Sequence, residues 1–314
     1  MKNKAKLIKL FLLVVLPSLF VSCSDDDNTN SVPQNNSIAA VASRSSQFTT
    51  LVSALERADL VSTLDGDGSY TVFAPTNTAF SNFLSDNGFS SLDDVPVTLL
   101  REILLNHVVL GTNLSTNLTT GYVKTLGKGS ASSSNTLSMY VNVGTNVILN
   151  GVSTVTTANI TADNGVIHEV NAVIGLPTVV THAAANSNFS TLVGLLSQQN
   201  LVDTLNGNAS SPFTVFAPSN MAFNTFETQN PGTLASLTSA QVTSVLTYHV
   251  VAGANVLSNA IPVGAITTLE SGTFTVNGTV ITDEANRMTN IVGFDIQASN
   301  GVIHVIDNII LPEL

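Results

Sequence analysis

Four histidines at repeated positions are the first candidates for acid–base or metal chemistry in this sequence. His107 and His249 each precede a Val-Val pair, and His168 and His304 each close the segment Asn-Gly-Val-Ile-His. An imidazole can exchange protons near neutral pH or bind a metal through a ring nitrogen. A zinc site built on two histidines would also need thiolates or carboxylates. The repeated segments share no cysteine and no acidic residue, so we expect neither a metal site nor another cofactor.

The same four histidines also fit structural roles. Strand alternation places His168 and His304 on a face with valine and isoleucine neighbours, which is typical of a core histidine bonded to the backbone. His107 and His249 are expected at helix ends, where an imidazole suits the negative terminus of the helix dipole. We therefore interpret these histidines as structural residues.

Other catalytic patterns are missing from the sequence. Asp65–Gly68 resembles the start of a calcium loop, but the twelfth position is Thr76 and no glutamate stands there. A hairpin turn is the expected structure at this segment. There is no Gly-x-Ser-x-Gly elbow, no thiol beyond residue 23 and no glycine-rich phosphate loop, and the carboxylates are scattered. These observations argue against an enzyme.

Two ten-residue segments organise the chain around these histidines. They read TVFAPTNTAF from residue 71 and TVFAPSNMAF from residue 214. The β-branched and aromatic residues favour a strand, which proline then ends because it has no N–H to donate. A short helix is expected to follow, capped in the first copy by Thr76 or Asn77. The structural residues of the two segments are Phe73, Pro75, Phe216 and Pro218.

The motifs repeat in the same order, which indicates a duplication. After each ten-residue segment come His-Val-Val, then Asn-Gly-Val-Ile-His, then Leu-Pro. A period near 140 residues is the size of a whole domain. We therefore predict two tandem domains, residues 37–177 (domain one) and residues 178–314 (domain two). The boundary contains no long linker, so limited freedom between the domains is expected.

The pattern within each domain changes from helical to extended. Apolar residues at helical spacing begin at Ser46, and further helices are expected over residues 98–106 and 239–247. Asn277-Gly278 predicts a two-residue hairpin turn. Helices early and strands late indicate an α+β domain. Short strands are expected over residues 137–143, 146–149, 273–276 and 279–282.

These motifs in combination resemble the fasciclin domain family. The TVFAP segment, the central His-Val-Val and the NGVIH segment look like the two signature motifs and the connecting Tyr-His segment of that family. The resemblance covers about residues 37–314. It implies two domains, each with a helical layer packed on a small β-sandwich or wedge, and a role in adhesion without catalysis.

The resemblance also implies candidate adhesion residues. Adhesion motifs of animal fasciclin domains match Tyr248 with His249, and Asp295 with Ile296, in domain two. Domain one has asparagine at the positions of the tyrosine and the aspartate, so domain two is expected to carry more of any adhesive activity. The alternative is that Tyr248 packs in the core and Asp295 is a solvated loop acid.

Residues 1–22 are expected to be a lipoprotein signal peptide. Four lysines precede the apolar segment Leu10–Val21, which is too short to span a bilayer. Leu19–Cys23 resembles a bacterial lipobox, which makes Cys23 the expected lipidation site. An ordinary cleaved signal with a stray cysteine is the alternative. Residues 23–36 are rich in Asp, Asn and Ser and are expected to form a disordered tether.

The charge of the remaining chain excludes some partners. Beyond the leader, six basic residues stand against 21 acidic ones, a net charge of −15. Nucleic acid requires clustered Lys and Arg to displace counterions, so it is excluded as a partner. We expect a lipid-anchored protein of the outer membrane that adheres to extracellular matrix, polysaccharide or a surface protein. The alternative function is an accessory glycan-binding lipoprotein of an uptake system.

The orientation of the anchored protein is open to a direct test. Ser24 and the acidic run Asp25, Asp26 and Asp27 resemble an export signal that sends lipoproteins to the cell surface. We predict that protease treatment of intact cells digests the protein, and that replacing the three aspartates by alanine protects it. Protection of the wild-type protein until lysis would place it facing the periplasm.

Overall fold

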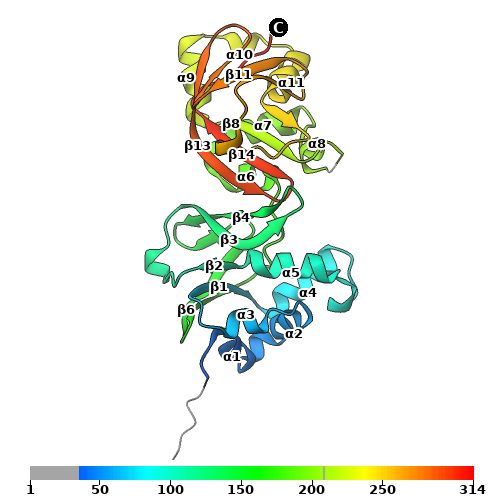
Figure 1. The fold of residues 1–314 in the computed structure, drawn as a ribbon, viewed down its shortest axis with the longest axis vertical. Coiled ribbons are helices and arrows are strands. Elements are labelled where there is room, and N and C mark those ends of the chain that lie inside the picture. The colour runs from blue at the N-terminus through cyan, green and yellow to red at the C-terminus, as the bar shows by residue number, and fades with distance from the viewer. Residues whose placement is uncertain (1–34, 208) are drawn as a thin grey trace, which may run out of the picture. The chain divides into compact units, whose positions relative to one another are not determined.

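The two TVFAP segments form the strands β1 (Tyr70–Pro75) and β8 (Phe213–Pro218), which lie inside their domains in the computed structural model (Figure 1). Both are buried along almost their whole length. The structure describes residues 35–207 and 209–314. The predicted signal peptide, the Cys23 lipidation site and the tether up to residue 34 lie outside the described residues.

Each domain begins with helices and ends with strands, which confirms the predicted α+β class. No helix in the described ranges is long and apolar enough to cross a membrane. The elements of domain one are α1 (Ile38–Ser43), α2 (Thr49–Arg57), α3 (Val61–Asp65), β1, α4 (Asn77–Asp86), α5 (Val97–Asn106), β2 (Val108–Leu110), β3 (Gly121–Gly129), β4 (Ser132–Val143), β5 (Val147–Leu149), β6 (Ser153–Ala162) and β7 (Gly165–Val170). Those of domain two are α6 (Val179–Ala185), α7 (Ser190–Gln198), α8 (Val202–Asn206), β8, α9 (Asn220–Gln229), α10 (Thr233–Ser236), α11 (Ser239–Tyr248), β9 (Val250–Ala252), β10 (Gly264–Thr267), β11 (Thr273–Asn277), β12 (Val280–Thr282), β13 (Met288–Ala298) and β14 (Gly301–Ile306).

The first and last strands of each domain pair in parallel. In domain one, β1 to β7 form a closed barrel, with β7 parallel to β1 and β2 antiparallel to it. Domain two has a sheet of order β10-β11-β12-β13-β14-β8-β9, in which β14 is parallel to β8. The register places Phe73 opposite His168 and Phe216 opposite His304. The two signature segments are therefore neighbours in space.

Strand β1 separates two apolar clusters, which explains why nearly every residue of TVFAP is apolar. Val72 and Ala74 belong to a cluster with residues of α2, α4 and α5, and Phe73 belongs to a second cluster with residues of β4 and β5. The equivalent residues of β8 divide in the same way. Fully burying a side chain such as Phe73 contributes about 1.5–3 kcal/mol.

The Thr/Ser-Asn pair after each proline connects two helices. Thr76 caps α4 by accepting a hydrogen bond from the Ala79 amide at 3.2 Å, as one of the two predicted alternatives. Asn77 instead reaches α2, because its side-chain oxygen accepts from the Thr50 amide at 2.9 Å. Domain two repeats both contacts from Ser219 and Asn220. The pair thus fixes how the helices approach the strand.

Two turn predictions are wrong in detail. Asn277 pairs with Val280, so the two residues of the hairpin turn are Gly278 and Thr279, one position later than predicted. Asp65–Gly68 is not a hairpin turn, because α3 ends at Asp65 and the segment connects a helix to β1. The Asp65 carboxylate accepts hydrogen bonds from Ser37 and Asn35, which lower its pKa. Asp65 therefore connects the end of α3 to the residues that precede α1.

Residues 35–314 pack as one compact unit, and several hydrogen bonds cross the predicted boundary. The Ser299 amide donates to the Pro177 carbonyl at 2.6 Å, and the Ser299 carbonyl accepts from the Ala131 amide at 2.8 Å. The Gln297 amide donates to Ser138 Oγ at 3.0 Å. Strands β4 and β13 therefore lie close together across the boundary.

The tight β8–β14 pairing generates a prediction for Gly301→Ala. A Cβ atom at Gly301 would lie 2.3 Å from the Phe213 carbonyl oxygen, so the variant has to separate the strands. We expect a loss of about 1–3 kcal/mol in the free energy of unfolding, measured by urea denaturation.

The control for this variant is Gly194→Ala. A Cβ at Gly194 in α7 meets nothing within 4 Å, and alanine in a helix is favoured over glycine by about 1 kcal/mol. This control is expected to be more stable than the wild type. Equal stability of the Gly301 and Gly194 variants would contradict the tight pairing.

Candidate functional site

The NGVIH histidines lie on the strand-rich side of each domain and are buried. His168 and His304 each stack near the phenylalanine opposite, with ring centroids 5.5 Å apart. His168 Nε2 donates to the Asn113 carbonyl at 2.9 Å, and Nδ1 accepts from the Asn159 amide at 3.3 Å. His304 makes the equivalent bonds. Burial lowers the pKa of both rings, so both are neutral connectors.

Each of these histidines contacts a bulge in the preceding strand. Register shifts occur at matching places in β6 and β13, where Asn159 and Asp295 have φ of 64° and 58°. Asparagine and aspartate tolerate this left-handed conformation better than most residues. Asp295 accepts from the Ser258 amide at 2.8 Å, as Asn159 does from Ser115. Both side chains therefore connect the bulge to a loop, through a carboxylate in Asp295 and through an uncharged amide in Asn159.

His107 and His249 follow the last residues of α5 and α11, as predicted, but they carry no charge there. His107 Nδ1 donates to the Ile103 carbonyl at 2.7 Å, and Nε2 accepts from the Ile174 amide at 2.9 Å. His249 bonds Val245 and Ile310 in the same way. Burial lowers the pKa of both to about 4. The predicted placement at the negative end of the helix is therefore confirmed, with a neutral ring that donates to a carbonyl of the last turn.

The candidate adhesion residues do not form a contact surface. Tyr248 is fully buried and its hydroxyl donates to the Thr273 carbonyl at 2.6 Å. His249 and Ile296 are also buried. Asp295 alone among the four reaches solvent, with a side chain 34% exposed. The alternative of a core tyrosine is therefore confirmed for Tyr248, whereas Asp295 lies in a strand bulge and not in a solvated loop.

His182 lies at the predicted boundary, where no sequence pattern marks it as a site residue. It is fully buried in α6, and its Nε2 donates to the Gln297 carbonyl at 3.2 Å. Its Nδ1 has no hydrogen-bond partner in the described structure. Tyr122 of domain one packs against the ring edge-on, and its hydroxyl donates to the His182 carbonyl. Burial, and to a smaller extent the nearby Lys124 ammonium, lower the pKa of His182 to about 4.

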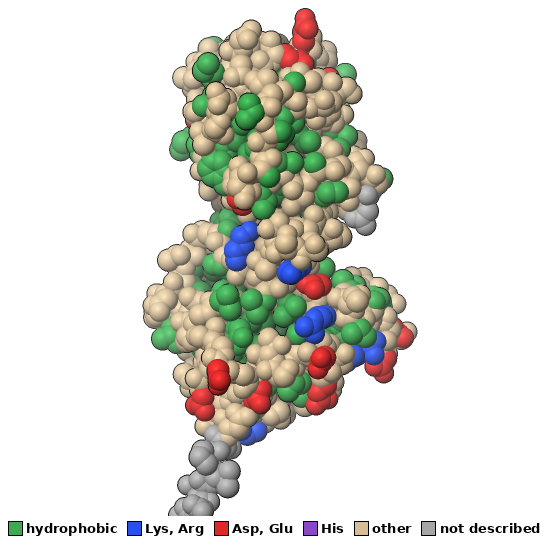
Figure 2. Space-filling view, viewed as in Figure 1, with side chains coloured by type: hydrophobic (Ala, Val, Ile, Leu, Met, Phe, Trp, Pro, Cys, Tyr) green, Lys and Arg blue, Asp and Glu red, His purple; other side chains and the backbone are tan. Residues whose placement is uncertain are grey.

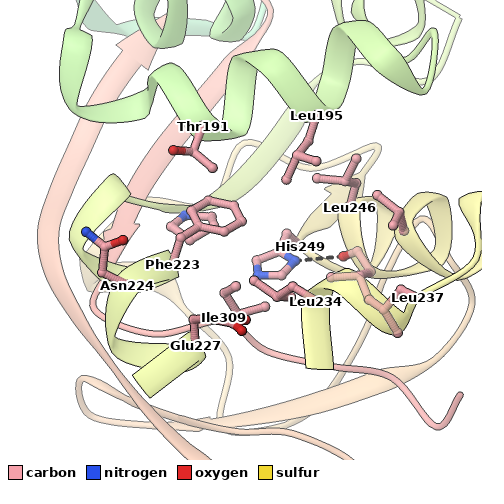
Figure 3. A pocket seen from close by; sticks show the side chains of 13 residues that line it. Thr191, Leu195, Phe223, Asn224, Glu227, Leu234, Leu237, Leu246, His249 and Ile309 are labelled. Atoms are coloured by element: carbon pink, nitrogen blue, oxygen red, sulfur yellow. Dashed lines mark hydrogen bonds between the residues drawn. The ribbon is translucent and has the colours of Figure 1, made fainter. Parts of the chain in front are cut away.

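A pocket of about 300 Å³ lies among the helices of domain two. Its walls come from α7, α9, α10 and α11, and the rings of Phe223 and His249 both belong to the lining (Figure 3). Glu227 and Asn224 are polar side chains of the lining. The sequence did not reveal this pocket, because its lining residues are far apart along the chain and have ordinary core types.

The histidines of the described residues are poorly placed for metal binding or acid–base chemistry. No group of three or more His, Cys, Asp or Glu in residues 35–207 and 209–314 could hold a metal ion. All five histidines are buried, with pKa values lowered from the ordinary range. Neutral imidazoles whose nitrogens bond the backbone connect elements of the fold, and they are poorly placed to exchange protons with a substrate.

Comparison with known proteins decides the family. The family model for the Fasciclin domain matches residues 46–177 and 187–312. The chain belongs to the fasciclin domain family. The two matched ranges contain the TVFAP and NGVIH strands of domain one and of domain two, so both fasciclin domains have their signature segments in the described structure.

Relatives match either one fasciclin domain or both. A protein of Synechocystis sp. is 38% identical over 138 residues, which are 43% of this chain and 98% of the relative. Human periostin is 31% identical over 266 residues, which are 80% of this chain but 29% of periostin. A solved FAS1 domain pair from the insect cell adhesion molecule fasciclin I is 22% identical, with a TM-score of 0.49, and covers 83% of this chain and 93% of its own.

The buried histidines generate a prediction for pH dependence. The folded-state pKa of about 4 for His107, His182 and His249 lies below the ordinary value of 6.5. Between these values the unfolded chain binds more protons, so stability is full above pH 6.5 and decreases as pH falls toward 4. Each histidine contributes a slope of up to about 1.4 kcal/mol per pH unit. Urea denaturation at several pH values measures it.

The matched variant is His182→Val, since matching the first helices of the two domains places Val41 there in domain one. Below pH 6.5 the free energy of unfolding of this variant is expected to fall less steeply than that of the wild type. The difference between the two slopes is expected to reach about 1.4 kcal/mol per pH unit. A chelator is expected to change neither protein. Stability independent of pH from 7 to 5 would show that these rings are charged or accessible in the fold.

Proposed function

We propose that this fasciclin protein is a non-catalytic adhesion protein, held at the outer cell surface by a lipid on Cys23. The observation that carries the proposal is the pair of complete fasciclin domains in which all five histidines are buried. Such domains can offer surfaces for binding but few groups for chemistry. The adhesive role of the insect fasciclin I pair is consistent with this proposal. Matrix, polysaccharide and surface protein are the proposed partners.

An apolar stripe on β13 is the proposed binding surface. Met288, Val292 and Phe294 are 73%, 58% and 42% exposed. Matching the bulges of the two domains places Thr156 and Ala158 of domain one at the positions of the latter two. Exposed apolar residues that gather on one strand often mark a protein interaction site. The stripe therefore supports stronger adhesion by domain two, through residues other than the predicted motif.

Lipid anchoring fits the electrostatics of the described residues. Basic side chains are few on the face shown in Figure 2, and domain two has Arg287 as its single basic residue. An acidic chain gains nothing from an anionic membrane surface, so attachment depends on the acyl groups, at about 0.8 kcal/mol per buried methylene.

The binding surface is tested by giving domain two the residues of domain one. The double variant V292T/F294A is made in the chain from residue 23 onward, and attachment to immobilised envelope and matrix fractions is measured. We expect a loss of roughly tenfold or more, because truncating an interface anchor commonly removes over 1 kcal/mol.

Tyr248→Phe serves as the control. It removes one buried hydrogen bond to Thr273 and leaves the stripe intact, so its folded fraction is expected to attach normally. Full attachment by V292T/F294A would show that the binding surface does not include the stripe. Saturable binding of soluble oligosaccharides with no surface attachment would favour the glycan-uptake function instead.

A further inference from the structure

At the pocket of domain two, α11 carries smaller side chains than its counterpart α5 in domain one, whereas Leu195 of α7 is larger than its counterpart Ala54. Matching the domains on His107 and His249 places Val242 at the position of Leu100 and Val245 at the position of Ile103. Leu100 is fully buried in its cluster, whereas Val242 is partly exposed at the pocket. Two valines thus leave space that leucine and isoleucine fill in the other copy.

A second pair of differences opens the pocket near α10. Counted from the TVFAP segment, Glu227 takes the position of Leu84, and Gly232, just before α10, takes the position of Phe89. Phe89 packs against Phe83, with ring centroids 6.5 Å apart. Domain two lacks this aromatic contact and has a carboxylate in the lining instead. The space of about 300 Å³ therefore has a carboxylate in its lining where domain one has a leucine.

The lining determines which chemistry the pocket can accept. His249 uses both ring nitrogens for backbone bonds, so it offers carbon atoms to the cavity, as do the leucines and Phe223 around it (Figure 3). Glu227 accepts one hydrogen bond, from the Gly232 amide at 2.5 Å. Its second oxygen has no hydrogen-bond partner in the described structure. The pocket therefore combines an apolar interior with one available carboxylate oxygen.

Charge decides between possible ligands. Arg287, the single basic residue of domain two, bonds Asp283 at 2.9 Å and does not line the pocket. A fatty acid or other anion would therefore meet Glu227 with no compensating cation. A protonated amine would neutralise the carboxylate and bury its carbon chain among the leucines.

We infer that the pocket binds a small molecule with an apolar body and a cationic amino group. The ammonium group bonds the available oxygen of Glu227, and the apolar body lies between Phe223, Leu195 and Leu246. Such a volume is at the lower end of small-molecule sites, which restricts the ligand to a short alkyl or single-ring amine. The inference does not depend on the adhesive function proposed above.

The experiment compares three probes of equal chain length, n-octylamine, 1-octanol and octanoate, by calorimetric titration of the chain from residue 23 onward. We expect octylamine to bind at least about tenfold more tightly than octanol, and octanoate not to bind. Absence of octylamine binding would overturn the inference. Equal binding of all three probes would overturn the role of the amino group.

Two variants locate the binding. V242L/V245I gives α11 the residues of domain one, so it fills the pocket and is expected to abolish octylamine binding while thermal melting stays equal or rises. Glu227→Gln keeps an acceptor for Gly232 and is expected to weaken octylamine about tenfold with octanol unchanged. Octylamine binding that survives in V242L/V245I would place the site elsewhere and overturn the inference.

Discussion

The parallel pairing of the first and last strands is the constraint on which each domain depends. Strand β1 contacts β7 along its whole length, and β8 contacts β14 in the same register. The strands must be buried on both faces, since helices lie on one side and the remaining strands on the other. The apolar TVFAP sequence, the glycine that opens the last strand and the proline that ends the first strand all follow from this arrangement.

Buried histidines add to this arrangement by connecting helix ends, bulges and loops that the strand pairing does not join. His107 and His249 join a helix end to the segment after the last strand, and His168 and His304 join that strand to a bulge and a loop. Each ring is neutral because charging it would require burying a cation. The histidines of the family motifs thus maintain connections between backbone segments.

Much of this fold could be predicted from the sequence, because the duplication showed which features are constrained. The proline stop, the Thr76 cap and the strand at residues 137–143 are local, and local chemistry determines them. The long strands β6 and β13 were not predicted, since their outward residues are polar or irregular at the bulges. The hairpin turn lies one residue later than predicted, because pairing with neighbouring strands sets the register.

The pocket could not be predicted, and neither could the role of His182. The pocket depends on the sizes of side chains at positions that meet only after several helices pack. Val242 has an ordinary core residue type in the sequence. Its significance appears only from the comparison with Leu100, which is fully buried at the matching position of domain one. His182 acquires its environment from Tyr122, which belongs to the other domain.

The parallel strand pairs also determine how each domain resists a pulling force. A tension that enters at the start of β1 and leaves at the end of β7 acts on opposite ends of two neighbouring parallel strands. The strands are then loaded in shear, so the hydrogen bonds across the six paired positions share the force and do not open one at a time. Domain two carries the same six-position geometry in β8 and β14. A chain anchored at one end and attached at the other would therefore place its mechanically strongest contact on the load path in each domain.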